Sequence, residues 1–406
     1  MTPSPVSDRS QAATDMLAAL YPAPLTVRLG SANRAAVKAS WLALPDVHNP
    51  RLLVTTGSSR AAVSTLRRQM TGQRSRTRLA RSALSLGVGT GVPRLVPRLR
   101  IVVTGPGDAA SIEDPLKEVL GVDHVCLTLP IGPARANRKP VLQVTDPAGH
   151  VLAYAKVGFN DLTRRLVEHE SATLERLSGS TFETIQPPRV LATVHWRDLT
   201  VVVMEPLEIP ARRLRGSAAR DRLISVTRDI ATLAAGPSLP WGEHPHRTAL
   251  DEGVAQCGQV ADRVHAQLAH LDGDVTVSDA SWHGDLNSGN IALVEGPCPV
   301  WDWERFESAV PLGFDLLHHD LHHSITVEHQ SALAAAQSLL LTSRTALEPL
   351  GVSAAAADIT ARSYLLTLAE RYLADRQDDA GSSLGRVHHW LLPALEGHSQ
   401  RTSKIT

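Results

Sequence analysis

The sequence predicts an α+β fold with two lobes, preceded by a small α+β module. Three observations support this prediction. The chain has 406 residues, which suggests two or three domains rather than one core. Short runs rich in Val, Leu and Thr dominate residues 125–207, as strands do. Apolar residues recur at three- and four-residue steps over most of residues 208–400, as in helices that bury one face.

Residues 1–124 are predicted to form an Arg-rich module of unknown role. The expected helices are 8–20, 58–70, 73–87 and 111–120, and the expected strands are 25–29, 37–44, 52–56 and 98–104. Arginines recur from Arg51 to Arg100 without any Asp or Glu. An acidic partner or surface is one interpretation of this block. We favour a solvated or intramolecular face, as is usual for charge runs. The block has no aromatic residue, which disfavours nucleic acid as a partner.

Residues 125–207 are predicted to form five strands with one helix after the third. The expected strands are 125–129, 141–145, 151–157, 190–194 and 200–204, and the expected helix is 161–178. Alternation places Lys156 on an apolar face of its strand, and Glu170 falls on an apolar stripe of the helix. Because a buried cation is costly without an anion, these side chains are predicted to meet. A purely structural salt bridge is the alternative interpretation.

Residues 208–400 are predicted to be mainly helical. The expected helices are 217–235, 248–271, 329–349, 354–376 and 384–395. Residues 280–306 are the exception, because they suit loops and short strands. There the sequence reads Trp-His-Gly-Asp-Leu-Asn-Ser-Gly-Asn from Trp282 to Asn290, and Trp-Asp-Trp-Glu from Trp301 to Glu304. Two carboxylates and a carboxamide, from Asp285, Asn290 and Asp302, suit a hard cation and have the spacing of a magnesium–nucleotide phosphotransfer site.

Several neighbouring residues have two interpretations. Asp285 is either the proton acceptor of such a site or a turn-capping residue. His283 is better interpreted as a backbone anchor than as a base, because a neighbouring carboxylate is the usual proton acceptor in phosphoryl transfer. Glu304 is either a further metal ligand or a support for one. His318, His319, His322 and His323 have helical spacings that zinc ligands can use, but we favour a helix that packs some histidines and exposes others.

These motifs resemble the aminoglycoside phosphotransferase and choline kinase-like family, the small-molecule branch of the protein-kinase-like fold. The similarity lies in His283-Gly284-Asp285 through Asn290 and in Trp301 to Glu304, and it covers roughly residues 125–400. It implies a bilobal protein-kinase-like fold with a nucleotide-binding N-lobe (125–207) and a helical C-lobe (208–400). The resemblance also implies that Asp285 is the catalytic base, next to His283. It makes Asn290 and Asp302 the Mg²⁺ ligands.

The same resemblance implies a set of nucleotide contacts in the N-lobe. Lys156 would hold the α- and β-phosphates, paired to Glu170. The loop from Gly132 to Lys139, with Asn137 and Arg138, would cover the phosphates. A hinge against the adenine would consist of three residues, Met204, Glu205 and Leu207.

We therefore expect an ATP-dependent phosphotransferase that moves the γ-phosphate to a hydroxyl of a small molecule, with GTP as the alternative nucleotide. A non-catalytic kinase-like scaffold or sensor, binding a partner through the Arg-rich module, is the competing hypothesis. No motif identifies the acceptor. Three widely spaced cysteines, the lack of a signal-like N-terminus and the lack of a long apolar run predict a soluble, cytoplasmic protein without a transmembrane segment.

Overall fold

The computed structural model describes residues 8–30, 36–69, 99–255 and 258–402. The chain divides into two compact units. Unit 1 comprises residues 1–171 and 189–206, and unit 2 comprises residues 172–188 and 207–406. The division falls inside helix α5 (Asp161–Leu177), so this helix contributes residues to both units.

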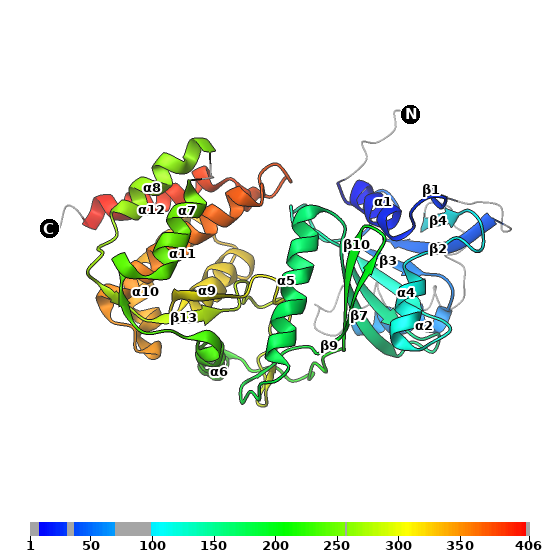
Figure 1. Cartoon of the computed structure of the whole chain (residues 1–406), viewed down its shortest axis with the longest axis horizontal. Coiled ribbons are helices and arrows are strands. Elements are labelled where there is room, and N and C mark those ends of the chain that lie inside the picture. The colour runs from blue at the N-terminus through cyan, green and yellow to red at the C-terminus, as the bar shows by residue number, and fades with distance from the viewer. Residues whose placement is uncertain (1–7, 31–35, 70–98, 256–257, 403–406) are drawn as a thin grey trace. The chain divides into compact units, whose positions relative to one another are not determined.

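Unit 1 contains a nine-stranded antiparallel sheet. Figure 1 shows the sheet with its helices on the N-terminal part of the chain. In spatial order the strands are β1 (Thr26–Leu29), β4 (Arg100–Thr104), β2 (Val37–Leu44), β3 (Leu52–Thr55), β5 (Cys126–Pro130), β6 (Val141–Thr145), β7 (Val151–Gly158), β10 (Leu199–Met204) and β9 (Val190–Trp196). The last five of these are the five strands predicted for 125–207, and α5 follows the third of them in the chain, as predicted.

The sheet runs without interruption across residues 124 and 125. Strand β3 pairs with β5, with Leu53 opposite Leu129. One core cluster also joins the two regions, since Trp41 and Ile101 share it with Leu127 and Val144. The division into a 1–124 module and a 125–207 lobe stays a prediction, but the strands on its two sides are hydrogen-bonded neighbours.

Three further helices belong to unit 1: α1 (Asp8–Leu20), α2 (Ser59–Gln69) and α4 (Glu113–Leu120). Helix α1 buries Met16, Leu17 and Leu20 in the core cluster. These helices agree with the expected ones. The expected helix 73–87 and most of the Arg block, from Arg74 to Arg98, lie outside the described residues.

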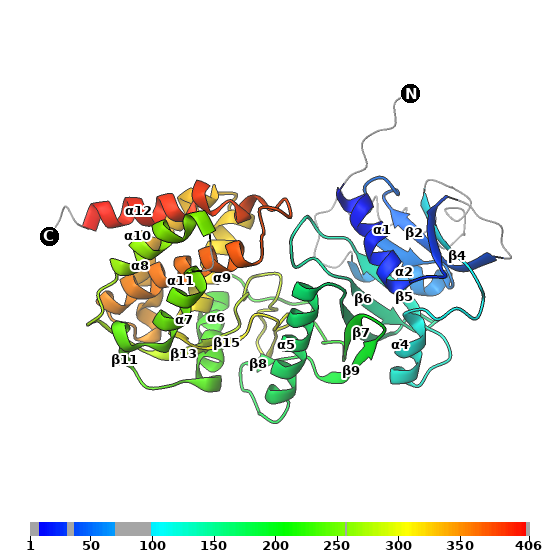
Figure 2. The ribbon, with the colours of Figure 1, turned by 45° about the horizontal axis from the view of Figure 1, so that its top comes forward.

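Unit 2 is mainly helical, and Figure 2 shows its helices gathered around α11. The helices are α6 (Gly216–Ala231), α7 (Pro245–Val254), α8 (Ala261–Ala269), α9 (Phe314–Thr326), α10 (Ala332–Leu347), α11 (Ala354–Ala374) and α12 (Leu391–Thr402). Its short strands pair as β13 (Asp279–Trp282) with β15 (Glu307–Pro311), β11 (Leu239–Pro240) with β12 (Thr276–Val277), and β8 (Ile185–Gln186) with β14 (Cys298–Pro299). Helix α11 is buried along most of its length and contacts α7, α8, α9, α10 and α12.

Two helix predictions in unit 2 are wrong. The expected helix 248–271 is two helices, because Gly258 adopts a left-handed φ of 63° between α7 and α8. Helix α7 also begins earlier than expected, at Pro245, where the His244 side chain accepts the backbone N–H of His246. The expected helix 384–395 consists of two short 3₁₀ turns followed by α12, which starts at Leu391.

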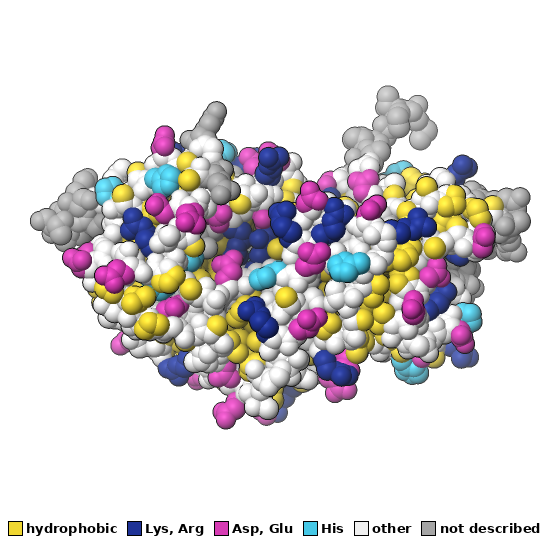
Figure 3. Space-filling view, viewed as in Figure 1, with side chains coloured by type: hydrophobic (Ala, Val, Ile, Leu, Met, Phe, Trp, Pro, Cys, Tyr) yellow, Lys and Arg dark blue, Asp and Glu magenta, His cyan; other side chains and the backbone are white. Residues whose placement is uncertain are grey.

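The predicted α+β fold class is confirmed, with the sheet in unit 1 and most helices in unit 2. On the face of the molecule in Figure 3, basic and acidic side chains are interspersed over both units. None of the described helices is long and apolar enough to cross a membrane.

Candidate functional site

The two sequence motifs of unit 2 are joined as a hairpin. The backbone N–H of Trp301 donates to the carbonyl oxygen of Asn290 at 3.0 Å, and that of Ala292 donates to Pro299 at 2.9 Å. Ile291 and Val300 form a bridge between these two bonds. The backbone therefore brings Asn290 next to Trp301, the residue before Asp302, although Asn290 and Trp301 are 11 positions apart in the chain.

Three side chains donate hydrogen bonds to the carboxylate of Asp285. Its Oδ1 accepts from Asn287 Nδ2 at 2.8 Å and lies 2.9 Å from His318 Nε2, while its Oδ2 accepts from Asn290 Nδ2 at 3.0 Å. Burial raises the pKa of Asp285, but the hydrogen bond and charge of His318 outweigh burial and hold this pKa below its usual range. About 33% of the Asp285 side chain remains exposed. The result is an oriented, ionised carboxylate that is partly open to solvent.

His283 links the two arms of the hairpin. Its ring Nε2 lies 3.1 Å from the carbonyl oxygen of Trp301, and its Nδ1 accepts the backbone N–H of Asp285 at 3.2 Å. Full burial lowers the pKa of His283 to about 4, so the ring is neutral near pH 7. Through these contacts the ring joins the backbone of the two arms, and the anchoring role of His283 stays a prediction.

Asp315, at the start of α9, supports the same loop. Its carboxylate accepts the backbone N–H groups of His283 at 2.8 Å and Gly284 at 3.3 Å. Burial raises the pKa of Asp315 to about 7, although both N–H donors and Arg371 favour the ionised form. The guanidinium of Arg371, on α11, donates to the carbonyl oxygen of Gly284 at 2.6 Å and lies over the ring of Trp282.

Gly284 is required by the packing between the two arms. It has a left-handed φ of 83°, and a Cβ atom there would lie 1.9 Å from the carbonyl oxygen of Arg305. Arg305 in turn forms an ion pair with Asp375. A larger residue at position 284 would push the segment after Asp302 away from Asp285.

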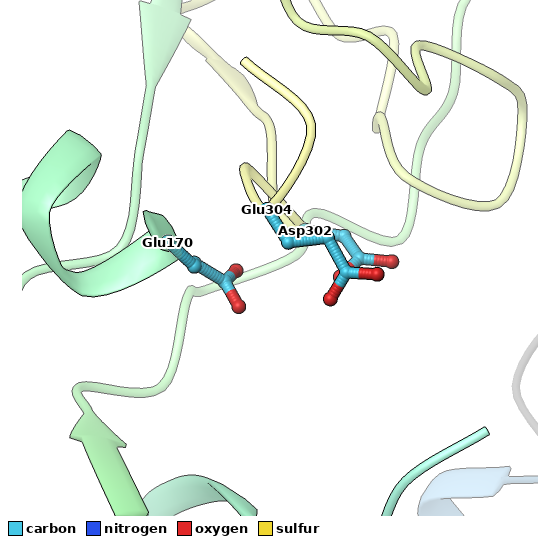
Figure 4. Close-up of side chains that lie close together, drawn as sticks. All are labelled: Glu170, Asp302 and Glu304. Carbon is cyan, nitrogen blue, oxygen red and sulfur yellow. The ribbon is translucent and has the colours of Figure 1, made fainter. Parts of the chain in front are cut away.

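The donors that could hold a cation in unit 2 are oxygen atoms. A carboxylate oxygen of Asp302 and one of Glu304 lie within 4.8 Å of each other, and Figure 4 shows both side chains leaving the same loop. The backbone of Asp302 has a left-handed φ of 74°, which few residue types other than Gly, Asn and Asp adopt readily. Because Asn290 donates through its nitrogen to Asp285, its amide oxygen is the atom that would bind a cation. This set of oxygen donors fits a hard cation such as Mg²⁺, whereas protein zinc sites usually include Cys or His.

The four histidines of α9 with helical spacing do not gather into a metal site in the described part of the chain. Within the described ranges, His318, His319, His322 and His323 belong to no group of three side chains that could hold a metal. The rings of His319 and His323 stack, and His318 is buried against Asp285.

The predicted contact between Lys156 and Glu170 is present in unit 1. Lys156 lies on β7 and Glu170 on α5, and the Lys156 Nζ atom lies 2.6 Å from each carboxylate oxygen. The exposed fractions of the two residues are 6% and 0%. Glu170 is also drawn in Figure 4. A buried ion pair of this kind fixes the ammonium group in one position, so it could meet a phosphate without losing further freedom.

The loop between β5 and β6 is held by the N-terminal region. The guanidinium of Arg138 donates to both carboxylate oxygens of Asp8, at 2.6 and 3.0 Å. The backbone N–H of Ile131 donates to the carbonyl oxygen of Arg51. Gly132 is exposed, and a Cβ atom at this position would have no neighbour within 4 Å, whereas Asn137 is half-buried. The predicted phosphate loop is thus anchored at its two ends by residues 1–124.

The three predicted hinge residues lie at the end of β10 and just after it. Met204 is buried at the end of the strand, opposite Tyr154 of β7. The carboxylate of Glu205 forms an exposed ion pair with Arg189, and its backbone N–H donates to the Arg189 carbonyl oxygen at 2.8 Å. Leu207 is half-buried and is the first residue of this segment assigned to unit 2.

Sequence reasoning assigned no role at the site to Asn287, His318, Tyr364 or Arg371. Of these, His318 had a usable signal: the histidine spacing indicates a helix, and if that helix starts at Asp315, three residues earlier, the two residues share a face. Arg371 and Tyr364 come from α11, and nothing in the local sequence shows that this helix packs beside the 283–290 loop.

No family model and no curated protein matches the chain. Several solved structures are similar to it at low identity. A thermostable mutant of aminoglycoside phosphotransferase APH(4)-Ia, in complex with ADP and hygromycin B, is 15% identical, with a TM-score of 0.43, and the match covers 72% of this chain and 98% of that one. The GDP complex of aminoglycoside 2'-phosphotransferase-IIIa is 12% identical, with a TM-score of 0.42 and coverage of 65% and 90%. Aminoglycoside phosphotransferase APH(3'')-Id from Streptomyces rimosus is 18% identical, with a TM-score of 0.36 and coverage of 56% and 88%.

Proposed function

We propose that this chain is a nucleotide-dependent phosphotransferase that moves the γ-phosphoryl group of ATP to a hydroxyl of a small molecule. The observation that carries the proposal is the 283–304 hairpin. It presents an oriented, ionised carboxylate at Asp285, which accepts from Asn290, and its backbone bonds bring Asn290 next to Trp301, the residue before Asp302. Phosphoryl transfer requires mainly positioning and neutralisation of charge, and these groups provide both.

Asp285 is the proposed base. The acceptor's O–H bond breaks, its proton passes to the Asp285 carboxylate, and its oxygen forms a bond to the γ-phosphorus. The bond between this phosphorus and the β–γ bridging oxygen breaks, and the nucleoside diphosphate leaves with that electron pair. The three donors around Asp285 keep its carboxylate in one orientation for the acceptor. Two of them, Asn287 and His318, bond to Oδ1, and the third, Asn290, bonds to Oδ2.

Asn290 and Asp302 are the proposed ligands of Mg²⁺, with Glu304 beside Asp302. When bound, this ion would neutralise the charge of the nucleotide phosphates. The role of the chain is to hold these oxygens together. The hairpin bonds fix the backbone at Asn290, and the left-handed backbone of Asp302 sets the direction of its side chain.

Lys156 is the proposed phosphate contact in unit 1, with Glu170 as its partner. Asn137 and Arg138 are proposed to face the phosphates from the β5–β6 loop, near Gly132, and the segment Met204–Leu207 is proposed to lie against the base. GTP would meet the same phosphate-binding residues, so nucleotide preference depends on that last segment.

The test is magnesium-dependent turnover of ATP and GTP, with water and with a panel of hydroxyl metabolites as acceptors. We expect turnover in the wild type and a loss of about 10²–10⁴-fold in Asp285→Asn. The matched control is Asp378→Asn, which alters a carboxylate in an exposed ion pair with Arg386. Equal turnover in Asp285→Asn and the wild type would contradict the proposal.

The alternative, a scaffold or sensor that binds nucleotide without turning it over, gives a different result in the same assay. It predicts binding of Mg²⁺ and nucleotide but no turnover with any acceptor, and no effect of Asp285→Asn. The retention of Asp285, Asn290, Asp302 and Lys156 favours the enzyme.

A further inference from the structure

The proposed base has a buried partner on α9 that the phosphotransfer chemistry described above does not use. His318 Nε2 lies 2.9 Å from Asp285 Oδ1, and His318 Nδ1 lies 3.0 Å from the hydroxyl oxygen of Tyr364 on α11. His318 is 7% exposed and Tyr364 is 0% exposed. The three side chains form a chain of hydrogen bonds that runs from the interior of unit 2 to the partly exposed carboxylate.

The partners determine where the protons lie in this chain. An ionised carboxylate only accepts hydrogen bonds, so Nε2 of His318 carries a proton and donates it to Asp285. When the imidazole is neutral, Nδ1 is the acceptor of the pair and the hydroxyl of Tyr364 donates to it, which selects the tautomer with its proton on Nε2. Burial raises the pKa of Tyr364 well above its usual range, so this hydroxyl keeps its proton.

The ring of His318 is also held in place by aromatic neighbours. Trp282 packs edge-on against His318 and against Tyr364, with centroid distances of 6.4 and 6.3 Å. Phe314, one turn earlier on α9, packs edge-on against both Trp282 and Tyr364. A ring that is held from several sides can direct one N–H at one oxygen atom.

We propose that His318 is a positioning residue for Asp285, and that Tyr364 fixes the tautomer of His318. The proposal rests on the proposed function, since it assigns a partner to the base of that reaction. By occupying Oδ1 together with Asn287, His318 would turn Oδ2 of the same carboxylate toward the acceptor hydroxyl.

Two substitutions of equal polarity separate positioning from packing. The amide nitrogen of Gln reaches about as far along the side chain as Nε2 of His, whereas that of Asn reaches only about as far as Nδ1. His318→Gln can therefore keep the hydrogen bond to Asp285, and His318→Asn cannot. The comparison is His322→Gln, one turn further along α9, where the ring stacks on that of His318. This variant removes a packing contact of His318 and leaves the His318 imidazole itself in place.

The experiment measures phosphate release from Mg²⁺·ATP, with water and with the best acceptor of the panel, together with binding of Mg²⁺·ADP. We expect kcat to fall about 10–100-fold in His318→Asn, as is common when an orienting partner is lost, and only a few-fold in His318→Gln. The kcat of Tyr364→Phe should lie between those of the two His318 variants, and the kcat of His322→Gln should equal that of the wild type. The affinity for Mg²⁺·ADP should stay within about twofold in every variant.

Equal kcat values in His318→Gln and His318→Asn, at whatever level, would overturn the proposal, because a packing role does not depend on the reach of the amide. The proposed function fails separately. If Asp285→Asn keeps wild-type turnover, the phosphotransferase assignment is wrong. If Asp285→Asn is inactive while both His318 variants turn over equally, only the role of His318 is wrong.

Discussion

The 283–304 hairpin of unit 2 and the β5–β6 loop of unit 1 are both predicted to face the phosphates, yet they are held in opposite ways. In the hairpin, the polar side chains around Asp285 are buried and bond to one another and to the hairpin backbone. In the loop, Arg138 is held by one partly exposed carboxylate, that of Asp8, 130 residues away. The hairpin is thus held by buried contacts within unit 2, whereas the loop is held by a partly exposed ion pair with a distant segment of unit 1.

Lys156 and Glu170 lie in unit 1, but their side chains are buried, as are those around Asp285 in the hairpin. Lys156→Met leaves the Glu170 carboxylate buried without its ammonium partner, so we expect a loss of about 3–5 kcal/mol in the free energy of unfolding. The double variant Lys156→Met/Glu170→Leu should recover most of that loss, since apolar pairs replace buried ion pairs well. Urea denaturation measures both effects.

The same double variant separates stability from binding. It should fold but bind Mg²⁺·ADP more weakly than the wild type. Wild-type affinity in the double variant would show that the ion pair is only structural, which is the alternative interpretation of the Lys156–Glu170 pattern.

Two glycines test the contrast directly. Gly284→Ala places a Cβ atom 1.9 Å from the backbone of Arg305 at a left-handed φ, so we expect a destabilisation of more than about 2 kcal/mol. Gly132→Ala meets open space at an ordinary φ, and its effect on the free energy of unfolding should lie within about 0.5 kcal/mol. Similar losses in the two variants would mean that the hairpin is no more tightly packed than the loop.

The smallest effect is expected at Asp8. Its ion pair with Arg138 is partly exposed, so Asp8→Asn should cost at most about 1 kcal/mol of stability. The KM for ATP should rise, by up to about fivefold, because the loop loses the contact that holds Arg138 but keeps every residue proposed to contact the nucleotide. Asp15→Asn, on the same helix, is the control. A KM equal to that of the control would show that α1 does not position the loop.

Local patterns in the sequence predicted much of the fold and part of the site. Alternation and helical stripes gave the five strands, α5 and the contact between Lys156 and Glu170, because each depends on a few neighbouring residues. The pairing of β3 with β5 was not predicted, since periodicity does not specify which strand edges meet. The helix break at Gly258 was missed because apolar spacing continues across it.

At the site, the residues that the sequence did not predict are those brought in by contacts between distant helices. Asn290 and Asp302 were proposed from their spacing in the motifs, and the hairpin bonds bring their backbones together. His318 was weighed as a zinc ligand instead of a partner of Asp285, because the packing of α9 against the 283–290 loop is a long-range contact. Arg371 and Tyr364, from α11, carried no local signal at all.

The central claim is that the hairpin holds a divalent ion together with the nucleotide, and binding of Mn²⁺ in the presence of ADP tests it without any knowledge of the acceptor. Electron paramagnetic resonance of free Mn²⁺ gives the bound fraction. We expect one Mn²⁺ bound in the wild type and in Asp378→Asn. The Kd for Mn²⁺ should rise at least about tenfold in Asp302→Asn, where Asn still adopts the left-handed backbone readily. An unchanged Kd in Asp302→Asn would contradict it.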